Sequence, residues 1–356
     1  MTRPIDISKF RTSITKNIAG ISTGFNDPST WIDTGNYTLN KLISGDFKRG
    51  IPMGKVTIFA GDSGAGKSLV LSGSIVKNAQ DQGIFVVLLD TENALDESWL
   101  QALGVKTDSE HLLRIGVSMI DDVAKILSDF IKDYKSNYGE VDKADRPKVL
   151  FVIDSLGMLL TPTDVDQFNK GELKGDMGRK PKALLALVRN LVNMIADLEI
   201  GVACTNHTYA SQDMYDPDDK VSGGSGPIYA ASIVVTMKKK KLKEDEDGNK
   251  VADVRGIKAV CKVMKSRYSK PFESVEISVP YDVGIDQYSG LFDFFEKAGI
   301  LVKQGNRYKY TSKRSGEEMI EFRKNWTREM FDVVMDEFSD DDLIVNAEDS
   351  EFISEE

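Results

Sequence analysis

The sequence is poor in cysteine and has no long hydrophobic run. Only two of its 356 residues are cysteines, Cys204 and Cys261, and both lie in apolar stretches. Two cysteines cannot build a disulfide framework, so we expect a reducing, cytoplasmic environment. The longest apolar runs, such as residues 84–89 and 149–153, are far shorter than a membrane span, and the first residues lack the apolar region of a signal peptide. We therefore expect no contact with a membrane.

An excess of basic residues is also missing. The chain has 46 Lys and Arg residues against 56 Asp and Glu residues, a net charge of −10, and this sign alone argues against a nucleic-acid partner. Eight of the acidic residues, however, lie in residues 339–356, which contain no Lys or Arg. Without them the chain has 46 basic and 48 acidic residues, a net charge of −2. The acidity is therefore mostly that of a C-terminal tail.

Hydrophobic periodicity indicates strands that alternate with helices over most of the chain. Such alternation predicts a parallel sheet covered by helices on both faces, which is an α/β fold. Farther along, two apolar stretches at 232–241 and 254–265 flank a turn sequence at 246–249 and predict an antiparallel hairpin. The expected strands of the alternating part are 56–60, 85–89, 149–153 and 200–205, and its expected helices are 68–82, 96–103, 121–134 and 183–198.

Changes in pattern divide the chain into four predicted regions. Residues 1–35 form an N-terminal arm with one short helix at about 7–18, and residues 36–285 form the core. Residues 286–338 form a small α/β appendage that ends in a helix. Residues 339–356 form a disordered acidic tail, because they combine high charge with few apolar residues.

The strongest motif is Gly-Asp-Ser-Gly-Ala-Gly-Lys-Ser at 61–68, which matches the phosphate-loop pattern G-x-x-x-x-G-K-[ST] at every defined position. A predicted strand precedes it and a predicted helix follows, as this motif requires. In such a loop, backbone N–H groups surround phosphate oxygens, the lysine reaches the β- and γ-phosphates, and the serine hydroxyl binds Mg²⁺. We therefore predict that ATP and Mg²⁺ are bound by Gly61, Asp62, Ser63, Gly64, Ala65, Gly66, Lys67, Ser68 and Leu69.

Two carboxylates follow other predicted strands. Asp154 ends the apolar run 149–153, which is where a phosphate-loop protein places the aspartate that holds the Mg²⁺ shell. Glu92 follows the strand at 85–89 and is a candidate base that orients the attacking water. From position alone, Glu92 could equally be a helix cap or a solvated loop carboxylate.

Together these motifs resemble the RecA-type homologous recombinases. The resemblance rests on Gly-Ile-Pro-Met-Gly-Lys at 50–55, the phosphate loop, and Leu-Asp-Thr-Glu-Asn-Ala-Leu-Asp at 89–96. Asn-His-Thr-Tyr at 206–209 and Gly-Gly-Ser-Gly-Pro at 223–227 look most like the UvsX recombinases of tailed phages. The resemblance runs from about residue 31 to residue 338. It implies a RecA-like phosphate-loop core, in which a twisted, mostly parallel sheet lies between helices.

The resemblance also implies how the protein assembles. RecA-type subunits stack head to tail into a helical homo-oligomeric filament on single-stranded DNA, with ATP at the interface between subunits. The filament pairs this strand with homologous duplex DNA, and single-strand-binding and mediator proteins are further expected partners. The arm would dock on the neighbouring subunit, with Ile14, Ile18 and Phe25 as candidate anchors.

Several catalytic roles follow from the same resemblance. Glu92 matches the catalytic glutamate and Asp154 the metal-binding aspartate, which would act with Lys67 and Ser68. His207 occupies a position that senses the γ-phosphate, where many RecA proteins have glutamine. A neutral imidazole can still donate one hydrogen bond there.

Two further pairs are assigned by the resemblance. Asp96 and Trp99 would contact the adenine, although Trp99 could also be a core aromatic residue. Lys265 and Arg267 would reach the γ-phosphate of the neighbouring subunit, because alternate residues of an extended strand point to the same side. Without the resemblance, these two would be interpreted as a solvated basic strand end. His111 is interpreted as solvated surface.

The resemblance places DNA-binding loops at 162–181 and 211–228. The second loop is acidic, so its contacts would come from backbone N–H groups at Gly223 and Gly224. Met177 of the first loop would wedge between bases or simply pack. Phosphate contacts without sequence preference predict a steep salt dependence. The predicted contacts of the first loop and the helix after it are Lys170, Lys174, Met177, Gly178, Arg179, Lys180, Lys182 and Arg189.

A second basic region lies at 238–270, with twelve Lys and Arg residues and five acidic residues. Its lysine-rich run at 238–243 either contacts DNA or is a solvated hairpin edge. The acidic tail is either a solubilising segment or a polyanion that competes with DNA. RecA-type proteins carry such a tail, so the resemblance favours competition.

The sequence therefore predicts an ATP-dependent DNA recombinase, a DNA-dependent ATPase that forms filaments and catalyses strand exchange in recombination, repair or replication. It would act in the cytoplasm, which is that of the host cell if the chain is of phage origin. A hexameric DNA helicase with a RecA-like core is the alternative enzyme. A non-catalytic recombinase paralogue that mediates filament loading is the alternative binding protein, but the intact phosphate loop and carboxylates argue against it.

Overall fold

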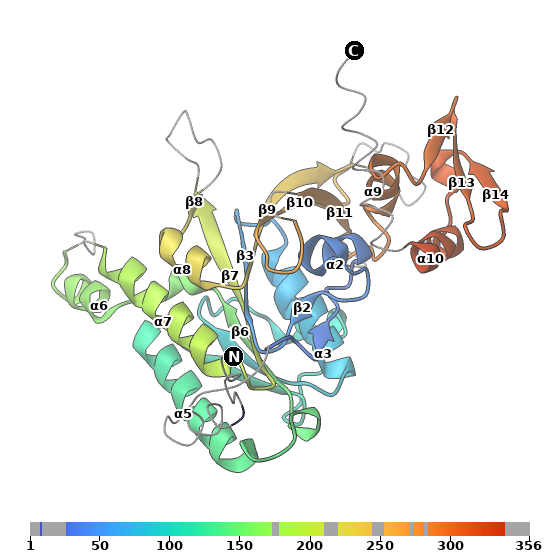
Figure 1. Cartoon of the computed structure of the whole chain (residues 1–356). Helices are drawn as coiled ribbons and strands as arrows, with labels where there is room; N and C mark the ends of the chain where they lie inside the picture. Colours follow the sequence, from blue (N-terminus) through green and yellow to red (C-terminus); the bar gives the residue numbers. More distant parts are fainter. Residues whose placement is uncertain are drawn as a thin grey trace, which may run out of the picture.

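The computed structural model describes Ser8 and residues 26–172, 178–209, 220–243, 253–270, 273–280 and 284–338. Figure 1 shows a central sheet with helices on both faces and a smaller unit at one side, formed by the last described residues. The α/β class predicted from the sequence is confirmed. The predicted hairpin turn, the acidic tail and all of the arm helix except Ser8 lie outside the described residues.

The central sheet has nine strands among the described residues, and its middle is parallel. The order is β11-β10-β9-β3-β7-β6-β4-β5, with β8 paired to β7. β9 joins the parallel part through β3 and the antiparallel part through β10, which confirms the predicted hairpin strands. The strands are β3 (Val56–Gly61), β4 (Phe85–Asp90), β5 (Leu112–Gly116), β6 (Val149–Asp154), β7 (Ile200–Tyr209), β8 (Lys220–Val221), β9 (Ile233–Leu242), β10 (Gly256–Lys265) and β11 (Ser274–Pro280).

Side chains of the parallel strands divide the core into two layers. In β4, Val86 and Leu88 pack on one face, and Val87 and Leu89 pack on the other, because successive residues of a strand point to opposite sides. All four are buried, as expected for a sheet covered on both faces. The first face is covered by α2 (Tyr37–Ser44), η1 (Leu69–Ile75) and α3 (Val76–Asp81), and the second by α5 (Ile120–Tyr138) and α7 (Arg179–Ile195).

The predicted strands of the alternating part are all confirmed as β3, β4, β6 and β7. The helices expected at 96–103, 121–134 and 183–198 correspond to α4 (Glu97–Ala102), α5 and α7. The helix expected at 68–82 begins as the π-helix η1 and continues as α3. The sequence prediction missed α2, β5 and β11.

The missed elements carried weak or short signals. Asn36 caps α2 by accepting a hydrogen bond from the backbone of Leu39 at 2.8 Å, and Gly45 ends it with a φ of +83°. This pair is a recognisable start and stop signal. β11 shows the alternation Val275, Ile277 and Val279. β5 is an edge strand with mostly exposed side chains, so it lacks a strong apolar pattern.

Residues just before the predicted core pack into it. β1 (Trp31–Ile32) pairs with β2 (Ile51–Pro52), and Ile32 is fully buried. The Trp31 ring packs edge-on against Tyr268, with 4.9 Å between the ring centroids. The packed body therefore begins before residue 36, and the division into four regions otherwise stays a prediction.

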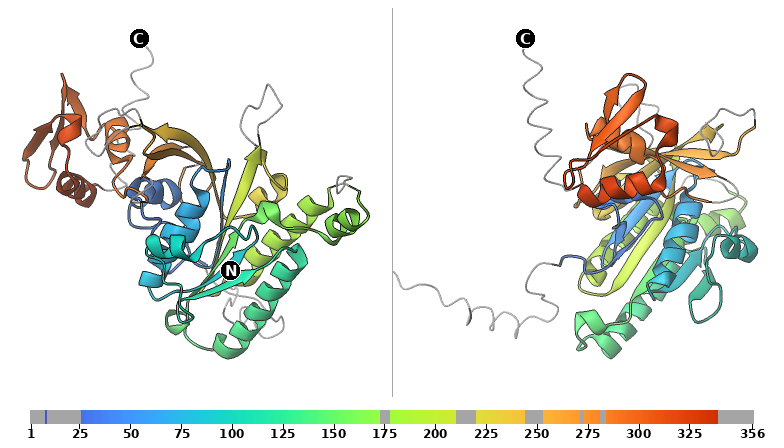
Figure 2. Two further views of the ribbon diagram at one scale, coloured as in Figure 1. Left: turned by 180° about the vertical axis from the view of Figure 1, so that it is seen from behind. Right: turned by 90° about the vertical axis from the view of Figure 1, so that its right-hand side faces the viewer.

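The C-terminal unit lies at one side of the central sheet (Figure 2). It has its own small hydrophobic core. Phe47, which follows α2, belongs to this core and lies 5.8 Å from Phe295 between ring centroids. The Asn36 amide also donates to the backbone oxygens of Asp286 at 2.8 Å and Ser289 at 3.0 Å. These contacts attach the unit to α2. Its elements are α9 (Leu291–Lys297), β12 (Val302–Gln304), β13 (Arg307–Thr311), β14 (Glu318–Glu321) and α10 (Arg328–Glu337).

Within the described ranges, none of the helices is long and apolar enough to cross a lipid bilayer.

Both cysteines are buried, Cys204 in β7 and Cys261 in β10. Burial raises the pKa of the Cys261 thiol to about 12 and also raises the pKa of Cys204. Because the thiolate is the reactive form, we expect neither cysteine of the native protein to react with iodoacetamide at pH 8, and both to react in urea. Mass spectrometry would count the labels. Rapid labelling of the native protein would contradict this burial.

Candidate nucleotide and DNA site

The phosphate loop lies at the carboxyl end of β3 and leads into η1. Gly64 and Gly66 have φ angles of +72° and +89°, a conformation that side chains disfavour. A side chain on Gly61 would collide with the backbone oxygen of Met237, and a Cβ on Gly66 would lie 3.1 Å from Ile257. The turn and the neighbouring strands β9 and β10 therefore both require glycine. This glycine-lined backbone fits a phosphate group, as the motif predicts.

Lys67 is a buried cation within the loop. Its side chain is folded inward, and Nζ donates to the backbone oxygens of Gly61 and Asp62 at 2.8 Å each. Burial lowers the pKa of Lys67, while the carboxylates of Asp154, Glu92 and Asp62 act in the opposite direction. The predicted metal and catalytic carboxylates thus lie close enough to Lys67 to affect its pKa.

Asp154 lies at the end of β6, almost completely buried. Its Oδ2 accepts from the Ser72 hydroxyl at 2.9 Å, and its Oδ1 accepts from the Thr205 hydroxyl. Ser72 lies about one helical turn after Ser68, so Asp154 sits under the start of the helix that carries Ser68. Each carboxylate oxygen has two lone pairs, so these hydroxyls leave acceptor capacity toward a cation.

Glu92 belongs to a hydrogen-bonded triangle. The Ser155 hydroxyl donates to Glu92 Oε1 at 2.7 Å, and His207 Nε2 lies 3.0 Å from the same oxygen and 3.2 Å from Ser155 Oγ. The Ser155 backbone is held in turn by Thr91, whose Oγ1 accepts from the Ser155 N–H at 2.7 Å. Glu92 and His207 remain about one-third exposed. Three strand ends therefore fix this carboxylate while leaving it open to solvent.

Asp96 and Trp99 lie at the start of α4. Asp96 is its N-cap, and its Oδ1 accepts from the Ser98 hydroxyl and from the Trp99 N–H at 3.0 Å. These hydrogen bonds, with that from the Ser98 hydroxyl first, lower the pKa of Asp96. Trp99 packs in part against the main core. Both residues thus have structural roles, and their predicted contact with adenine stays a prediction.

Lys265 and Arg267 do not lie on one extended strand, so that prediction was wrong. β10 ends at Lys265, and the chain then bends. The Ser266 hydroxyl causes the bend, because it donates to the Ile43 backbone oxygen and accepts from the N–H groups of Tyr268 and Ser269. Lys265 Nζ donates to the backbone oxygen of Tyr229, and burial together with the Arg267 charge lowers the pKa of Lys265.

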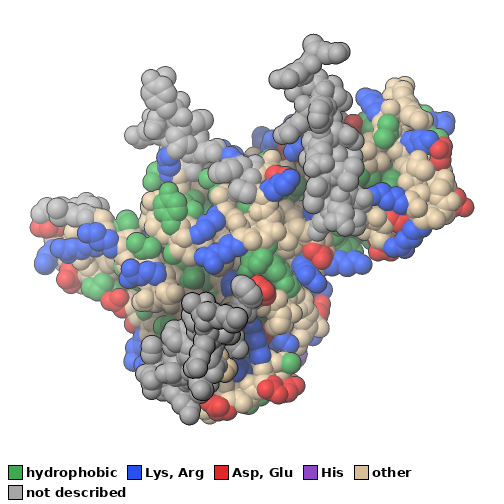
Figure 3. All heavy atoms as spheres, viewed as in Figure 1, with side chains coloured by type: hydrophobic (Ala, Val, Ile, Leu, Met, Phe, Trp, Pro, Cys, Tyr) green, Lys and Arg blue, Asp and Glu red, His purple; other side chains and the backbone are tan. Residues whose placement is uncertain are grey.

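The first predicted DNA loop contains a helix, α6 (Pro162–Asn169), and the first turn of α7. Treating all of residues 162–181 as a loop was wrong. Thr161 and Asp164 form a capping box with proline at the first helical position, and this signal is legible in the sequence. Figure 3 shows Lys and Arg side chains at the projecting end of α6 and α7, with acidic side chains among them.

The predicted cations near this end differ in their surroundings. Arg179 donates to the Thr163 hydroxyl at 2.9 Å, and Lys180 to the Gly157 backbone oxygen at 2.7 Å. Gly178 starts α7 with a φ of +82°. The side chains of Lys170, Lys182 and Arg189 are exposed. Lys174 and Met177 lie outside the described residues.

The second predicted loop also contains regular structure. β8 pairs with Thr208 and Tyr209 of β7, and α8 (Ser225–Ala230) follows. Gly223 and Gly224 have φ angles of +84° and +77°. A Cβ on Gly223 would lie 2.7 Å from Leu184 of α7. These glycines therefore allow close packing on the helix that carries the predicted DNA-binding cations.

A family model described as the RecA N-terminal domain matches residues 25–286. The chain belongs to the RecA family. The "Recombination and repair protein" of Enterobacteria phage T4 is 29% identical over 294 residues, which cover 81% of this chain and 69% of that protein. The "Protein RecA" of Desulforapulum autotrophicum is 27% identical over 292 residues, which cover 80% and 75%. That of Geobacter sulfurreducens is 27% identical over 290 residues, which cover 80% and 77%.

These matches confirm the RecA resemblance, including its phage-type character, and the RecA-like core. The matched region contains the phosphate loop, Glu92, Asp154 and His207. The individual roles of these residues stay predictions. The structure adds Ser72, Ser155 and Thr205, which the motifs did not single out, because their contacts join segments far apart in the chain.

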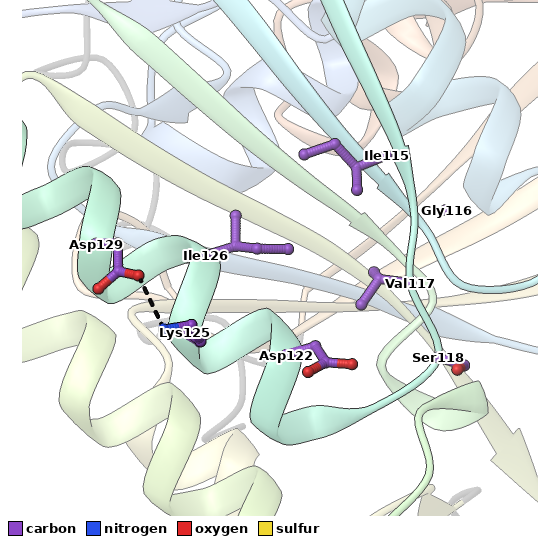
Figure 4. Close-up of a pocket in the computed structure, with 8 residues that line it drawn as sticks. All are labelled: Ile115, Gly116, Val117, Ser118, Asp122, Lys125, Ile126 and Asp129. Atoms are coloured by element: carbon purple, nitrogen blue, oxygen red, sulfur yellow. Dashed lines mark ion pairs between the residues drawn. The ribbon is translucent and has the colours of Figure 1, made fainter.

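A cavity of about 410 Å³ lies elsewhere, between β5 and α5 (Figure 4). Its lining includes Ile115, Ser118 and the ion pair of Lys125 with Asp129, whose Nζ and Oδ2 are 3.4 Å apart. It contains none of the predicted site residues. The cavity is therefore not part of the predicted nucleotide or DNA site.

Asp90, at the end of β4, is fully buried and forms an ion pair with Arg114 of the edge strand β5. Arg114 Nη2 and Nε lie 2.5 Å and 3.2 Å from Asp90 Oδ2. Asp90 Oδ1 has no hydrogen-bond partner among the described residues. Only Thr91 separates Asp90 from Glu92 in the sequence, so the ion pair with Arg114 anchors the segment that carries Glu92.

We expect Arg114→Met to reduce the free energy of unfolding by about 3 kcal/mol, because it leaves a buried carboxylate unpaired. Urea denaturation would measure the loss. The double variant Asp90→Asn with Arg114→Met should recover part of it, since no unpaired charge remains. A loss below about 1 kcal/mol for Arg114→Met would contradict this account of the ion pair.

Proposed function

We propose that this RecA-family chain is an ATP-dependent DNA recombinase. It forms helical filaments on single-stranded DNA and catalyses homologous pairing and strand exchange. The observation that carries the proposal is the cluster of phosphate loop, Asp154 and Glu92 at one sheet edge, in a chain of this family. The names of the relatives, "Recombination and repair protein" and "Protein RecA", support the same function.

The site fits ATP hydrolysis to ADP and phosphate. ATP would supply the phosphoanhydride bond that is hydrolysed, and Mg²⁺ would neutralise part of the phosphate charge. The loop backbone and Lys67 bind the phosphates, while the Ser68 hydroxyl and Asp154 hold the metal. Asp96 and Trp99 bind the base. These residues act mainly by positioning and by electrostatic stabilisation, which dominate phosphoryl transfer.

Glu92 orients the attacking water and accepts its proton. The Ser155 hydroxyl and His207 both contact one of its oxygens. They fix its direction while the exposed side receives water. His207 also follows Asn206, whose side chain donates to the Ser222 backbone oxygen at 2.9 Å. The nucleotide site is thus connected to the segment that precedes Gly223 and Gly224.

DNA would be held through phosphates. Exposed Lys170, Lys182 and Arg189, together with Arg179, lie along α6 and α7. Such contacts carry no sequence information, so base pairing between strands supplies the specificity. Lys180, Gly178, Gly223, Gly224 and, outside the described residues, Lys174 and Met177 complete the proposed surface.

Filament assembly would complete the catalytic site. Lys265 and Arg267 reach the γ-phosphate of a neighbouring subunit and neutralise charge in the transition state. Lys265 would have to leave its present position, because it now donates to the Tyr229 backbone oxygen, whereas Arg267 is already exposed. Single-strand-binding and mediator proteins are proposed partners. The two buried free thiols fit a reducing cytoplasm, that of the host if the chain comes from a phage.

The test combines ATPase assays with and without single-stranded DNA, joint-molecule formation and electron microscopy. We expect DNA-stimulated hydrolysis, joint molecules and open helical filaments. Closed rings that unwind duplex DNA would indicate the helicase instead. DNA binding without hydrolysis or joint molecules would indicate the mediator.

Glu92→Gln should lower the DNA-stimulated kcat by about a hundredfold or more, because it removes a general base. ATP-dependent filaments should persist, since the amide keeps the shape of the side chain. Glu110→Gln is the matched control, because this exposed residue lies just before β5, at the opposite end of the sheet. Hydrolysis at the wild-type rate would disprove the role of Glu92.

Truncation after Phe338 should strengthen DNA binding, most clearly at low Mg²⁺, because it removes eight carboxylates that compete with DNA phosphates. Fluorescence anisotropy with single- and double-stranded oligonucleotides would measure the affinity. A full-length control in which these eight residues become Asn or Gln separates charge from length. Unchanged affinity in both variants would leave the tail as a solubilising segment.

A further inference from the structure

β9 runs alongside the phosphate loop. It pairs in parallel with β3 up to Gly61 opposite Met237. There β3 ends and the loop begins, while β9 continues to Leu242 and pairs with β10. Figure 1 shows β9 next to β3 at this end of the sheet. The lysine-rich stretch of β9 is therefore placed beside the loop by strand pairing.

Alternation along β9 separates its lysines. Met237 is buried against Gly61 and Gly66 of the loop, and Lys239, two residues later, shares its face. Lys239 Nζ donates to the Ser63 backbone oxygen at 2.6 Å. Lys240 points to the other side, where it pairs with Glu276 of β11. The lysine run is thus not one uniform surface.

Two ammonium groups cap three successive carbonyls of the loop. Lys67 donates to the backbone oxygens of Gly61 and Asp62, and Lys239 donates to the backbone oxygen of Ser63. The Lys239 charge also contributes to the lowered pKa of Lys67, so the two cations are close. A Cβ on Gly64 would lie 3.4 Å from Lys239 Nζ, which places this ammonium over the glycine turn.

A phosphate oxygen is a stronger partner for an ammonium group than a neutral carbonyl oxygen. Lys239 is exposed and its stem is flexible, so its head can exchange one acceptor for the other. The loop end that it covers carries no other lysine or arginine between residues 61 and 66. Lys239 approaches from outside the loop, whereas Lys67 lies within it.

We propose that Lys239 is a second phosphate-binding lysine of the nucleotide site, which transfers from the Ser63 carbonyl to the terminal phosphate of a nucleoside triphosphate. This inference rests on the proposed function, because it requires that the loop bind ATP. It assigns one member of the lysine run to nucleotide rather than to DNA or solvent.

The experiment compares Lys239→Met with Lys240→Met, which removes the neighbouring charge on the opposite face. Fluorescence titration with mant-ATP and mant-ADP in Mg²⁺ measures affinity. We expect Lys239→Met to weaken mant-ATP binding about tenfold or more, because a charge-assisted hydrogen bond is lost. Binding of mant-ADP, which lacks the terminal phosphate, should weaken less than about threefold. Lys240→Met should change neither, and Lys239→Arg should restore much of the affinity for mant-ATP.

The outcomes separate this inference from the proposed function. No mant-ATP binding by the wild type would overturn the ATP site itself. Wild-type binding with Lys239→Met unchanged, or weakened equally for both nucleotides, would overturn only the role of Lys239. The role of Lys239 would also be overturned if Lys239→Met bound nucleotide normally but showed a shallower salt dependence of DNA binding. That result would make Lys239 a DNA contact. Thermal unfolding midpoints confirm that the variants are folded.

Discussion

In the middle of the sheet, Gly61 of β3 lies opposite His207 of β7, and Asp154 of β6 lies opposite Asp90 of β4. Parallel strands end at the same edge, so this register brings the phosphate loop, the buried aspartate and the polar end of β7 together. A shift of one residue would turn each side chain to the other face of the sheet. The site of this RecA-family protein therefore depends first on strand register.

The core enforces that register. Alternate residues of β4 and β6 pack into two separate hydrophobic layers, one against η1 and α3 and the other against α5 and α7. Phe151, fully buried in the second layer, packs edge-on against Phe130 of α5. A slipped strand would exchange the partners of every buried side chain, and a close-packed interior does not absorb such changes. Packing of the core thus fixes the positions of the residues at the strand ends.

Hydroxyl groups at the strand ends then hold the carboxylates of the predicted site in position. Ser72 and Thr205 hold Asp154, while Ser155 holds Glu92. A neutral hydroxyl satisfies a buried carboxylate without cancelling its charge, so the anion stays available to a cation or a water. The opposite charge is supplied by Lys67 within the loop and by Lys239 beside it. The lysines and the carboxylates are thus held by different segments around the predicted phosphate-binding loop.

Local patterns in the sequence were sufficient for the phosphate loop, the buried strands and the RecA resemblance, because glycine spacing and apolar runs are encoded by adjacent residues. The prediction overlooked the capping box of Thr161 and Asp164, which is a local signal for α6. The bend after Lys265 carries no such signal, because the Ser266 hydroxyl contacts Ile43, 223 residues away in the chain. The local patterns also left open whether the lysine run contacts DNA or solvent. Only the tertiary structure decided which side chains meet, since the Ser72–Asp154 and Lys239–Ser63 contacts join residues 82 and 176 positions apart. Strand order brings these residues together, and strand order is a property of the packed sheet rather than of any one segment.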